Sequence, residues 1–209
     1  MGLTSLAKRV GVFGGAFDPP HLAHRALVET ALGQLQLDEL RVVPTGHAWH
    51  KQRSLSSAEH RVNMARLAFG DLPKVLIDER ETHRAGASYT VDTLHEMQGE
   101  QAGSEWFLVL GGDQARALPT WRNWQELLKC ATICIAQRQD ASAPQGEADP
   151  FVALFPSWPG RFVRLQLAEN PVSATQIRQQ LAQGQDVSPL VGPAVARYIA
   201  QHHLYSTPA

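Results

Sequence analysis

The sequence predicts an α/β protein with a doubly wound, mostly parallel sheet, helices on both faces of that sheet and a helical C-terminal end. Six short apolar runs rich in β-branched residues alternate with segments of helical spacing, and 209 residues suffice to bury a core on each face. Parallel strands need long crossover connections, and strands covered on both faces are continuously apolar. We therefore expect one domain over residues 1–209, with its C-terminal helical part at about residues 170–209.

The alternation of the two patterns along the chain is what favours a parallel sheet. The predicted strands are residues 9–13, 40–44, 74–78, 106–110, 131–136 and 162–167. The predicted helices lie at about residues 21–35, 58–69, 90–98, 123–128, 174–182 and 193–201. Residues 137–146 are polar and punctuated by Pro and Gly, so we expect a mobile excursion there and not a domain boundary.

The composition excludes several classes of partner. A formal net charge of -1, from 19 basic and 20 acidic residues, gives no basic surface for a nucleic acid polymer or an anionic membrane. No run approaches the roughly 20 apolar residues that span a bilayer, and the N-terminal segment lacks the apolar centre of a signal peptide. We expect a cytoplasmic protein that acts on small molecules; its oligomeric state stays open.

The two cysteines, Cys130 and Cys134, lie in an apolar stretch. The sequence holds no second cysteine pair that would complete a zinc site. We therefore expect both thiols to be buried and unreactive, and we assign no residue as a metal ligand.

A strand, a glycine turn and a helix start follow one another near the N-terminus. Gly14 and Gly15 follow the first predicted strand, and without side chains they let the main chain approach a ligand closely. Pro19 and Pro20 suit the entry into a helix. The N-terminus of that helix offers N–H groups and a positive dipole end, which together favour a bound phosphate.

His21 and His24 stand three residues apart, which places both on one face of the first helical turn. Imidazole N–H groups there can donate to phosphate oxygens, and a protonated ring offsets charge that builds as a phosphorus is attacked. A single histidine on a helix face is more often structural than catalytic. A pair placed directly after a glycine turn favours a catalytic phosphate site.

Residues 14–24 read Gly-Gly-Ala-Phe-Asp-Pro-Pro-His-Leu-Ala-His. This run resembles the signature G-G-[ST]-F-D-P-x-H-x-G-H of bacterial nicotinate-nucleotide adenylyltransferases, which belong to the Rossmann-like nucleotidyltransferases. Ala16 replaces the usual hydroxyl residue and Ala23 the usual glycine. The resemblance implies a catalytic role for the two histidines. The residues that it implies for ATP binding in this run are Gly14, Gly15, Ala16, Phe17, His21 and His24.

A second element near the C-terminus resembles the family pattern I-S-[SA]-T-x-I-R, because residues 172–178 read Val-Ser-Ala-Thr-Gln-Ile-Arg. Asn170, Ser173 or Thr175 is suited to cap the helix that follows, and Arg178 to reach an anion at its start. The resemblance implies that Ser173, Thr175 and Arg178 hold the β- and γ-phosphates of ATP, with Arg178 also catalytic. An ordinary capped surface helix is the alternative.

The fourth predicted strand ends in Gly-Gly-Asp113, and Trp121 follows, which is similar to the family's G-x-D…W segment. Ligands of open α/β sheets bind at the carboxyl ends of strands, where Asp113 is placed. The resemblance implies that Asp113 lies near the adenosine, that Trp121 stacks on the pyridine ring, and that Arg138 faces the adenine. For Trp121, an ordinary core position is the alternative.

Ser88, Tyr89 and Thr90 match the family's S-Y-T, whose helix start receives the nicotinate carboxylate. The resemblance adds Gly15 and Lys51 to this mononucleotide site. A carboxylate only accepts hydrogen bonds whereas an amide also donates them, so such a site favours the acid over the amide. Thr90 as a simple N-cap is the alternative.

Taken in chain order, these elements imply transfer of the adenylyl group of ATP to nicotinic acid mononucleotide. The products are nicotinic acid adenine dinucleotide and pyrophosphate, in NAD biosynthesis. The resemblance also implies Mg²⁺, which bridges phosphates and keeps most of its waters. Two alternatives stay open: a different acceptor, such as phosphopantetheine or glycerol phosphate, and a module that senses the nucleotide without turning it over.

Overall fold

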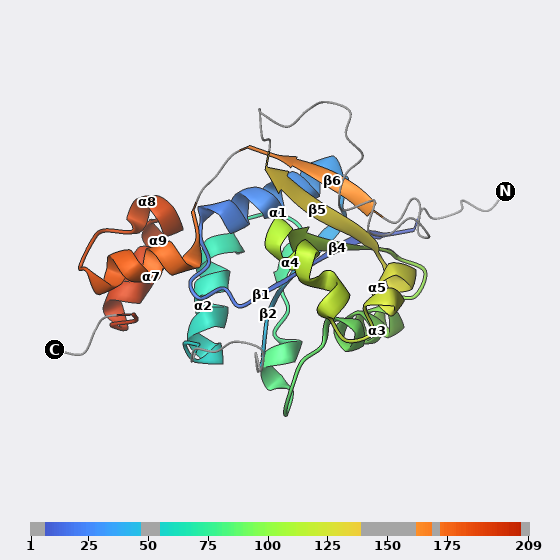
Figure 1. The fold of residues 1–209 in the computed structure, drawn as a ribbon, viewed down its shortest axis with the longest axis horizontal. Coiled ribbons are helices and arrows are strands. Elements are labelled where there is room, and N and C mark those ends of the chain that lie inside the picture. The colour runs from blue at the N-terminus through green and yellow to red at the C-terminus, as the bar shows by residue number, and fades with distance from the viewer. Residues whose placement is uncertain (1–6, 47–54, 139–161, 169–171, 206–209) are drawn as a thin grey trace.

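The computed structural model describes residues 7–46, 55–138, 162–168 and 172–205, and within these ranges six strands form one sheet (Figure 1). The strands are β1 (Arg9–Gly15), β2 (Glu39–Pro44), β3 (Val75–Ile77), β4 (Glu105–Gly111), β5 (Thr132–Arg138) and β6 (Phe162–Leu167). Their order is β3-β2-β1-β4-β5-β6, and every neighbouring pair is parallel. The predicted doubly wound, Rossmann-like sheet is therefore confirmed.

Helices lie against both faces of the sheet (Figure 1). They are α1 (Leu22–Gln34), α2 (Ala58–Phe69), α3 (Thr90–Glu100), α4 (Gly112–Ala117), α5 (Trp124–Cys130), α7 (Ala174–Ala182), α8 (Ser188–Val191) and α9 (Pro193–Gln201). Two 3-10 turns, η1 (Arg80–His83) and η2 (Leu118–Thr120), complete the connections. In the described ranges no helix is long and apolar enough to cross a membrane.

Two buried apolar clusters occupy the two faces, because successive residues of a strand point to opposite sides. On β1, Phe13 belongs to the cluster that includes Val28 of α1 and residues of α2, α7 and α9. Its neighbour Val12 belongs to the other cluster, with Leu94 of α3 and Leu127 of α5. The sheet is thus covered by α1, α2 and the C-terminal helices on one face and by α3, α4 and α5 on the other.

The helices α7, α8 and α9 gather at one end of the molecule beside α2 (Figure 1). Ile177 of α7 and Ile199 of α9 belong to the same buried cluster as Phe13 of β1. The Tyr198 hydroxyl on α9 accepts a hydrogen bond from the Asn63 side-chain nitrogen at 3.1 Å. The C-terminal helices therefore share the core of one face of the sheet.

Two of the helices were not predicted from the sequence. The helix α4 begins at Gly112, and a Gly-Gly pair disfavours a helix and reads as a turn. The helix α8 spans only four residues, too few for an apolar period to appear. The strand β5 continues to Arg138, so the predicted excursion is wrong for residues 137 and 138; its remaining residues, 139–146, lie outside the described ranges.

The cysteines differ from each other, contrary to the prediction. Cys134 of β5 is buried, and burial raises the pKa of its thiol to about 12. Cys130 at the end of α5 is only half-buried, and its Sγ lies 3.3 Å from His95 Nε2. The prediction of a buried thiol is therefore wrong for Cys130, because the last turn of a short helix leaves it partly exposed; its low reactivity stays a prediction.

Candidate active site

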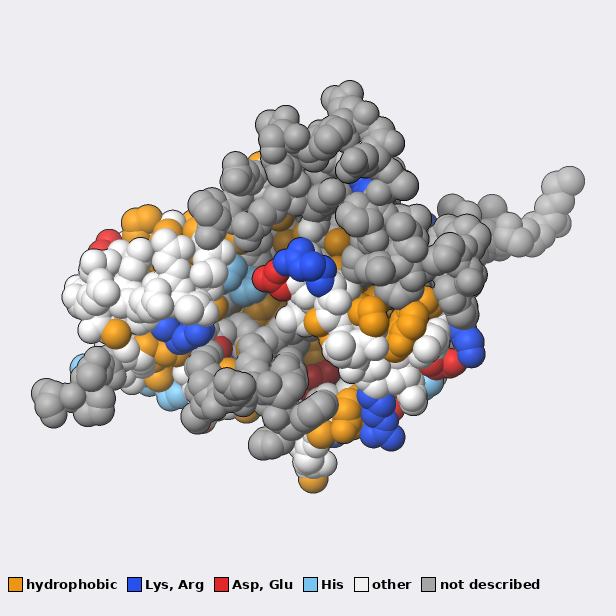
Figure 2. All heavy atoms as spheres, in the orientation of Figure 1, with side chains coloured by type: hydrophobic (Ala, Val, Ile, Leu, Met, Phe, Trp, Pro, Cys, Tyr) orange, Lys and Arg blue, Asp and Glu red, His pale blue; other side chains and the backbone are white. Residues whose placement is uncertain are grey.

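The candidate site lies at the carboxyl ends of β1 and β4. These strands are neighbours, but β1 connects to β2 on one side and β4 to β5 on the other. In open α/β sheets, ligands bind in the crevice that such a reversal creates. Figure 2 shows a hollow in one face of the molecule, between the C-terminal helices and the opposite half, with histidine side chains on its wall.

The turn that leaves β1 folds a phenylalanine back over a glycine. Phe17 has a φ of 48°, which is uncommon for a residue with a side chain, and its ring is 2% exposed. A Cβ added to Gly15 would lie 3.0 Å from that ring. The ring also meets the edges of Phe13 and Phe69, with centroids 5.4 and 5.7 Å away. Phe17 is therefore packed into the core, and its main chain shapes the turn.

His21 and His24 stand together at the start of α1, as predicted. His21 is the N-cap residue, and the two rings stack with centroids 3.7 Å apart and an interplanar angle of 20°. The backbone N–H of His21 donates to His24 Nδ1 at 3.3 Å. Because Nδ1 is the acceptor, a neutral His24 carries its proton on Nε2. The first turn thus presents a ring N–H as a hydrogen-bond donor.

The ring of His21 is buried, with 7% of the residue exposed. Its Nδ1 has no hydrogen-bond partner among the residues that the structure describes. Burial lowers the pKa of His21 to about 4, so the ring is neutral near pH 7 in the protein without ligand. A buried polar atom without a partner is costly, and such atoms mark places where a ligand supplies the missing bond.

Arg178 joins the C-terminal element to the turn after β1. Its Nη1 donates to the carbonyl oxygen of Asp18 at 2.8 Å, and its Nη2 donates to Thr175 Oγ1 at 3.1 Å. Ser173 is the N-cap of α7, where its hydroxyl accepts a hydrogen bond from the backbone N–H of Gln176 at 3.2 Å. The structure therefore places the arginine of the second motif beside the first.

Asp18 fastens the same turn from within, a role that the sequence did not reveal. The residue is 2% exposed. Its Oδ1 accepts from the Tyr205 hydroxyl at 2.5 Å, and its Oδ2 from the backbone N–H of Ser56 at 3.4 Å. Asp18 stood within the recognised run, whereas nothing in the sequence marks Tyr205, which lies 187 positions away.

Arg61 of α2 is a second positioning residue that sequence reasoning missed. It is 2% exposed, and its guanidinium donates to the carbonyl oxygens of Ala16 at 3.1 Å and Thr45 at 2.7 Å. Two further bonds reach the carbonyl oxygens of Ser56 at 3.0 Å and Gly46 at 3.4 Å. Arg61 thus ties the loop after β1 to the loop after β2. The signal was an arginine among the apolar positions of a helix.

The predicted mononucleotide side lies at the start of α3. Tyr89 is the N-cap, without a side-chain capping bond, and Thr90 is the first helical residue, so the alternative of Thr90 as N-cap is wrong. Tyr89 and Trp121 are both partly buried against the same apolar cluster, and the Arg122 guanidinium lies 4.5 Å from the Tyr89 ring. Trp121 is therefore not enclosed in the core. The hydroxyl of Ser88 donates to a carbonyl of η1 at 3.4 Å.

The structure gives less detail about three other predicted site residues. Asp113 lies in the first turn of α4, directly after β4, with a side chain that is 90% exposed and paired with Arg116. Arg138 is the last residue of β5 and so lies at the carboxyl edge, but its side chain is outside the description. Lys51 lies outside the described residues.

Known proteins are similar to this chain over most of its length. The cytidylyltransferase-like family model matches residues 12–180. A probable nicotinate-nucleotide adenylyltransferase of Albidiferax ferrireducens is 55% identical over 96% of this chain and 99% of its own. One of Methylibium petroleiphilum is 42% identical over 96% of this chain and 94% of its own.

Solved structures share the fold. The nicotinic acid mononucleotide adenylyltransferase of Plasmodium falciparum complexed with NaAD has a TM-score of 0.77 at 19% identity, over 95% of this chain and 97% of that one. The same enzyme complexed with APC gives 0.76 at 20% identity, over the same shares of the two chains. Fold and relatives agree, and the chain belongs to the nicotinate-nucleotide adenylyltransferases within the cytidylyltransferase-like family.

Proposed function

We propose that the chain transfers the adenylyl group of ATP to nicotinic acid mononucleotide, which gives nicotinic acid adenine dinucleotide and pyrophosphate in NAD biosynthesis. The observation that carries this proposal is the bond from Arg178 to the carbonyl of Asp18, which brings two distant motifs together at the topological switch point. The homologues that are named for this activity match over nearly their whole length.

ATP is proposed to bind with its phosphates between the first turn of α1 and the first turn of α7. We expect N–H groups at the start of α1 and donors of His21, His24 and Arg178 to bind the phosphates, since Arg178 is bonded to the turn that precedes α1. The main chain from Gly14 to Phe17 approaches the phosphates, while Ser173 and Thr175 meet the β- and γ-phosphates. Asp113 and Arg138 take the adenosine end.

The reaction is attack of a mononucleotide phosphate oxygen on the α-phosphorus of ATP. A P–O bond forms to the acceptor, and the bond between the α-phosphorus and the bridging oxygen breaks, so pyrophosphate leaves with the electron pair. No side chain of the protein acts as nucleophile. His24 Nε2–H, His21 and Arg178 stabilise the negative charge that builds on the phosphoryl oxygens, in positions fixed before the substrate arrives.

The acceptor is proposed to lie over Trp121, with its carboxylate at the start of α3. The N-cap of α3 makes no side-chain capping bond, which leaves the N–H groups of Thr90 and Val91 to bind an anion, while that of Asp92 donates to the Tyr89 carbonyl. Ser88, Tyr89 and Thr90 supply this end, and Gly15 and Lys51 the phosphate end. A nicotinamide in the same position would bring N–H donors against N–H donors, which disfavours the amide.

The metal of the reaction is proposed to be Mg²⁺, which arrives bound to ATP. Among the described residues near the turn, Asp18 already accepts hydrogen bonds from Tyr205 and Ser56, and Asp113 is paired with Arg116. These carboxylates form no cage, which fits a cation that binds phosphates and keeps several waters. When bound, Mg²⁺ neutralises charge on the phosphates and on the leaving pyrophosphate.

The proposal also covers the domain organisation and the cellular location of the chain. Because Ile177 and Ile199 share the core with Phe13, we regard residues 1–209 as one functional unit, placed in the cytoplasm. The whole chain carries a formal net charge of -1, so we propose small molecules and no nucleic acid polymer as its partners.

The test is an assay of pyrophosphate release with ATP, Mg²⁺ and one acceptor at a time. We expect rapid release with nicotinic acid mononucleotide and slower release with nicotinamide mononucleotide. Release with phosphopantetheine or glycerol phosphate instead would assign a different acceptor. Tight ATP binding without release with any acceptor would identify a nucleotide sensor and contradict the proposal.

Arg178→Lys tests the ATP side. Lysine keeps the charge but loses the planar fork that bonds Asp18 O and Thr175 Oγ1, so we expect kcat/KM for ATP to fall about 10- to 100-fold. Arg197→Lys, at an exposed position on α9, is the matched control and should leave kcat/KM unchanged. Equal activity of the two variants would assign Arg178 a role in packing alone.

A further inference from the structure

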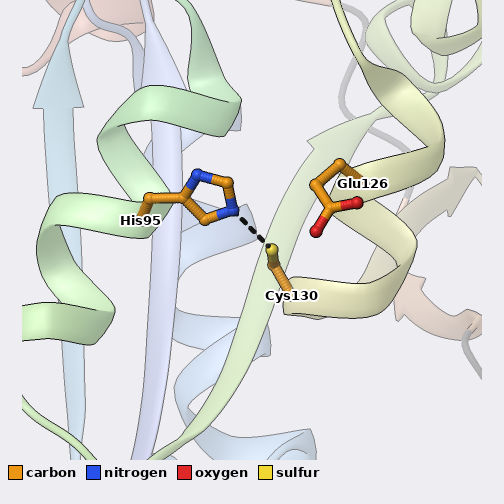
Figure 3. Close-up of side chains that lie close together, drawn as sticks. All are labelled: His95, Glu126 and Cys130. Carbon is orange, nitrogen blue, oxygen red and sulfur yellow. Dashed lines mark hydrogen bonds between the residues drawn. The ribbon is translucent and has the colours of Figure 1, made fainter.

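We propose that His95, Glu126 and Cys130 bind one thiophilic divalent cation, with Zn²⁺ preferred, at a site separate from the nucleotide site. Figure 3 shows the three side chains pointing toward one another from α3 and α5. One ligand atom of each residue lies within 4.8 Å of those of the other two. Imidazole nitrogen, thiolate sulfur and carboxylate oxygen are the ligands that zinc takes in proteins.

The two helices hold these side chains in place. Glu126 and Cys130 are four residues apart on α5 and therefore lie on one face of that helix. The side-chain nitrogen of Gln98 on α3 donates to the carbonyl oxygen of Cys130 at 3.0 Å, which clamps the end of α5 against α3. Below the cluster, Leu94 and Leu127 belong to one buried apolar core. The ligand atoms are thus positioned by packing that exists without a metal.

The distance between Cys130 Sγ and His95 Nε2 is close to the sulfur–nitrogen distance in a tetrahedral zinc site. A zinc ion with Zn–S of about 2.3 Å and Zn–N of about 2.0 Å sets sulfur and nitrogen roughly 3.5 Å apart. Cys130 Sγ and His95 Nε2 are 3.3 Å apart. Little movement of either side chain is needed to accept the ion between them, and the Glu126 carboxylate lies within reach as the third ligand.

The charges also fit a divalent cation. Binding displaces the Cys130 proton to solvent, and the resulting thiolate together with the Glu126 carboxylate neutralises two positive charges. Lys129 now bonds Glu126 Oε2 at 2.8 Å, and with a side chain that is 59% exposed it is able to turn away into water. A set with sulfur and imidazole selects zinc over Mg²⁺ or Ca²⁺ and leaves one position for water.

The position of the cluster predicts a structural effect. Cys130 precedes the first residue of β5, so the cluster lies toward the sheet edge opposite the carboxyl ends. An ion there joins α3, which begins at Thr90, to α5, which follows Trp121. Bound zinc therefore stabilises the two helices that follow the mononucleotide residues in the chain, and it takes no part in the chemical step.

Cobalt titration of the full-length, tag-free protein, first stripped of metal with a chelator, tests this proposal. Co²⁺ reports a sulfur ligand directly through a thiolate-to-metal charge-transfer band. We expect about one equivalent to bind with this band, and Zn²⁺ to displace it and to raise the melting temperature. Cys130→Ser should abolish the band, whereas Cys134→Ala, the matched control at the buried cysteine, should keep it.

His95→Asn serves as a second variant, because His95 is exposed and its loss leaves the core intact. Loss of an outer-shell partner alone weakens metal sites about 10-fold or more, so we expect at least that loss of Co²⁺ affinity. Absence of the band in the wild type, or its persistence in Cys130→Ser, overturns the proposal. So does binding through histidines alone, for example at His60 and His202, whose rings lie 5.0 Å apart.

Discussion

Replacing His24 by alanine is expected to lower kcat by about 10²-fold or more while the fold stays intact, as is typical for loss of one well-placed transition-state donor. The physical reason is the orientation of its ring. Nδ1 accepts the backbone N–H of His21 at 3.3 Å, so a neutral ring carries its proton on Nε2, which we propose donates to ATP. The ring is half-buried against Phe13 and Phe17, with centroids 5.9 and 5.3 Å away, which fixes it before ATP binds.

The measurement is steady-state pyrophosphate release at saturating ATP and nicotinic acid mononucleotide, with circular dichroism to confirm folding. His83→Ala is the matched control, since its side chain is 76% exposed on η1. We expect normal kcat in the control. If folded His24→Ala turns over at a near-normal rate, His24 has no part in the mechanism, and the charge must be stabilised by His21 and Arg178.

His21 is expected to make the folded protein less stable as the pH falls from about 6.5 to about 4. Burial lowers the pKa of its ring from 6.5 to about 4. Between these pH values the unfolded chain binds a proton that the folded chain does not. The stability that neutral His21 contributes is therefore fully present above pH 6.5 and is lost as the pH decreases toward 4. The loss amounts to about 2 kcal/mol at about pH 5 and approaches about 3 kcal/mol near pH 4.

Urea unfolding of the wild type and His21→Asn at about pH 7.5 and about pH 5 measures this effect. Asparagine is a favoured N-cap residue and does not titrate, so the variant keeps the start of α1 and removes the pH term. We expect the wild type to lose about 2 kcal/mol more than the variant between the two conditions. Equal losses in both proteins would mean that His21 is not buried in its neutral form.

The same burial has a consequence for substrate binding. We propose that His21, whose Nδ1 has no partner among the described residues, gains a hydrogen bond when an anionic phosphate binds, and that the anion then raises the pKa of the ring. On this proposal His21 takes up a proton only when the substrate brings the opposite charge. Two stacked rings 3.7 Å apart are best kept neutral until that moment.

The strands and long helices could be predicted from the sequence because their signals are local. All six predicted strands appear in the sheet, since each is a short apolar run with turn residues beside it. The helices α4 and α8 escaped prediction because one begins in a Gly-Gly pair and the other has four residues. Local signals of that kind are too short to separate from turns.

The residues that hold the site together could not be found in this way. Arg61 binds carbonyl oxygens of two loops, and Tyr205 reaches Asp18 across 187 positions. Every residue has a main-chain carbonyl oxygen, so the pattern of side chains in the sequence does not indicate which of these oxygens an arginine binds. The partner of Cys130 was hidden for the same reason, because His95 stands 35 positions before it on another helix.

By itself the sequence determined the fold class and the histidine pair at the start of α1, and it predicted a phosphate site at residues 14–24, since these depend on side chains close together along the chain. Only the tertiary structure decided that Arg178 bonds the carbonyl of Asp18, that His21 is buried with a lowered pKa, and that a cysteine meets a histidine and a glutamate. Burial and long-range contact depend on how α1, α3, α5 and α7 pack against the sheet. Packing of that kind depends on the whole core, so it cannot be predicted from any single segment of the sequence.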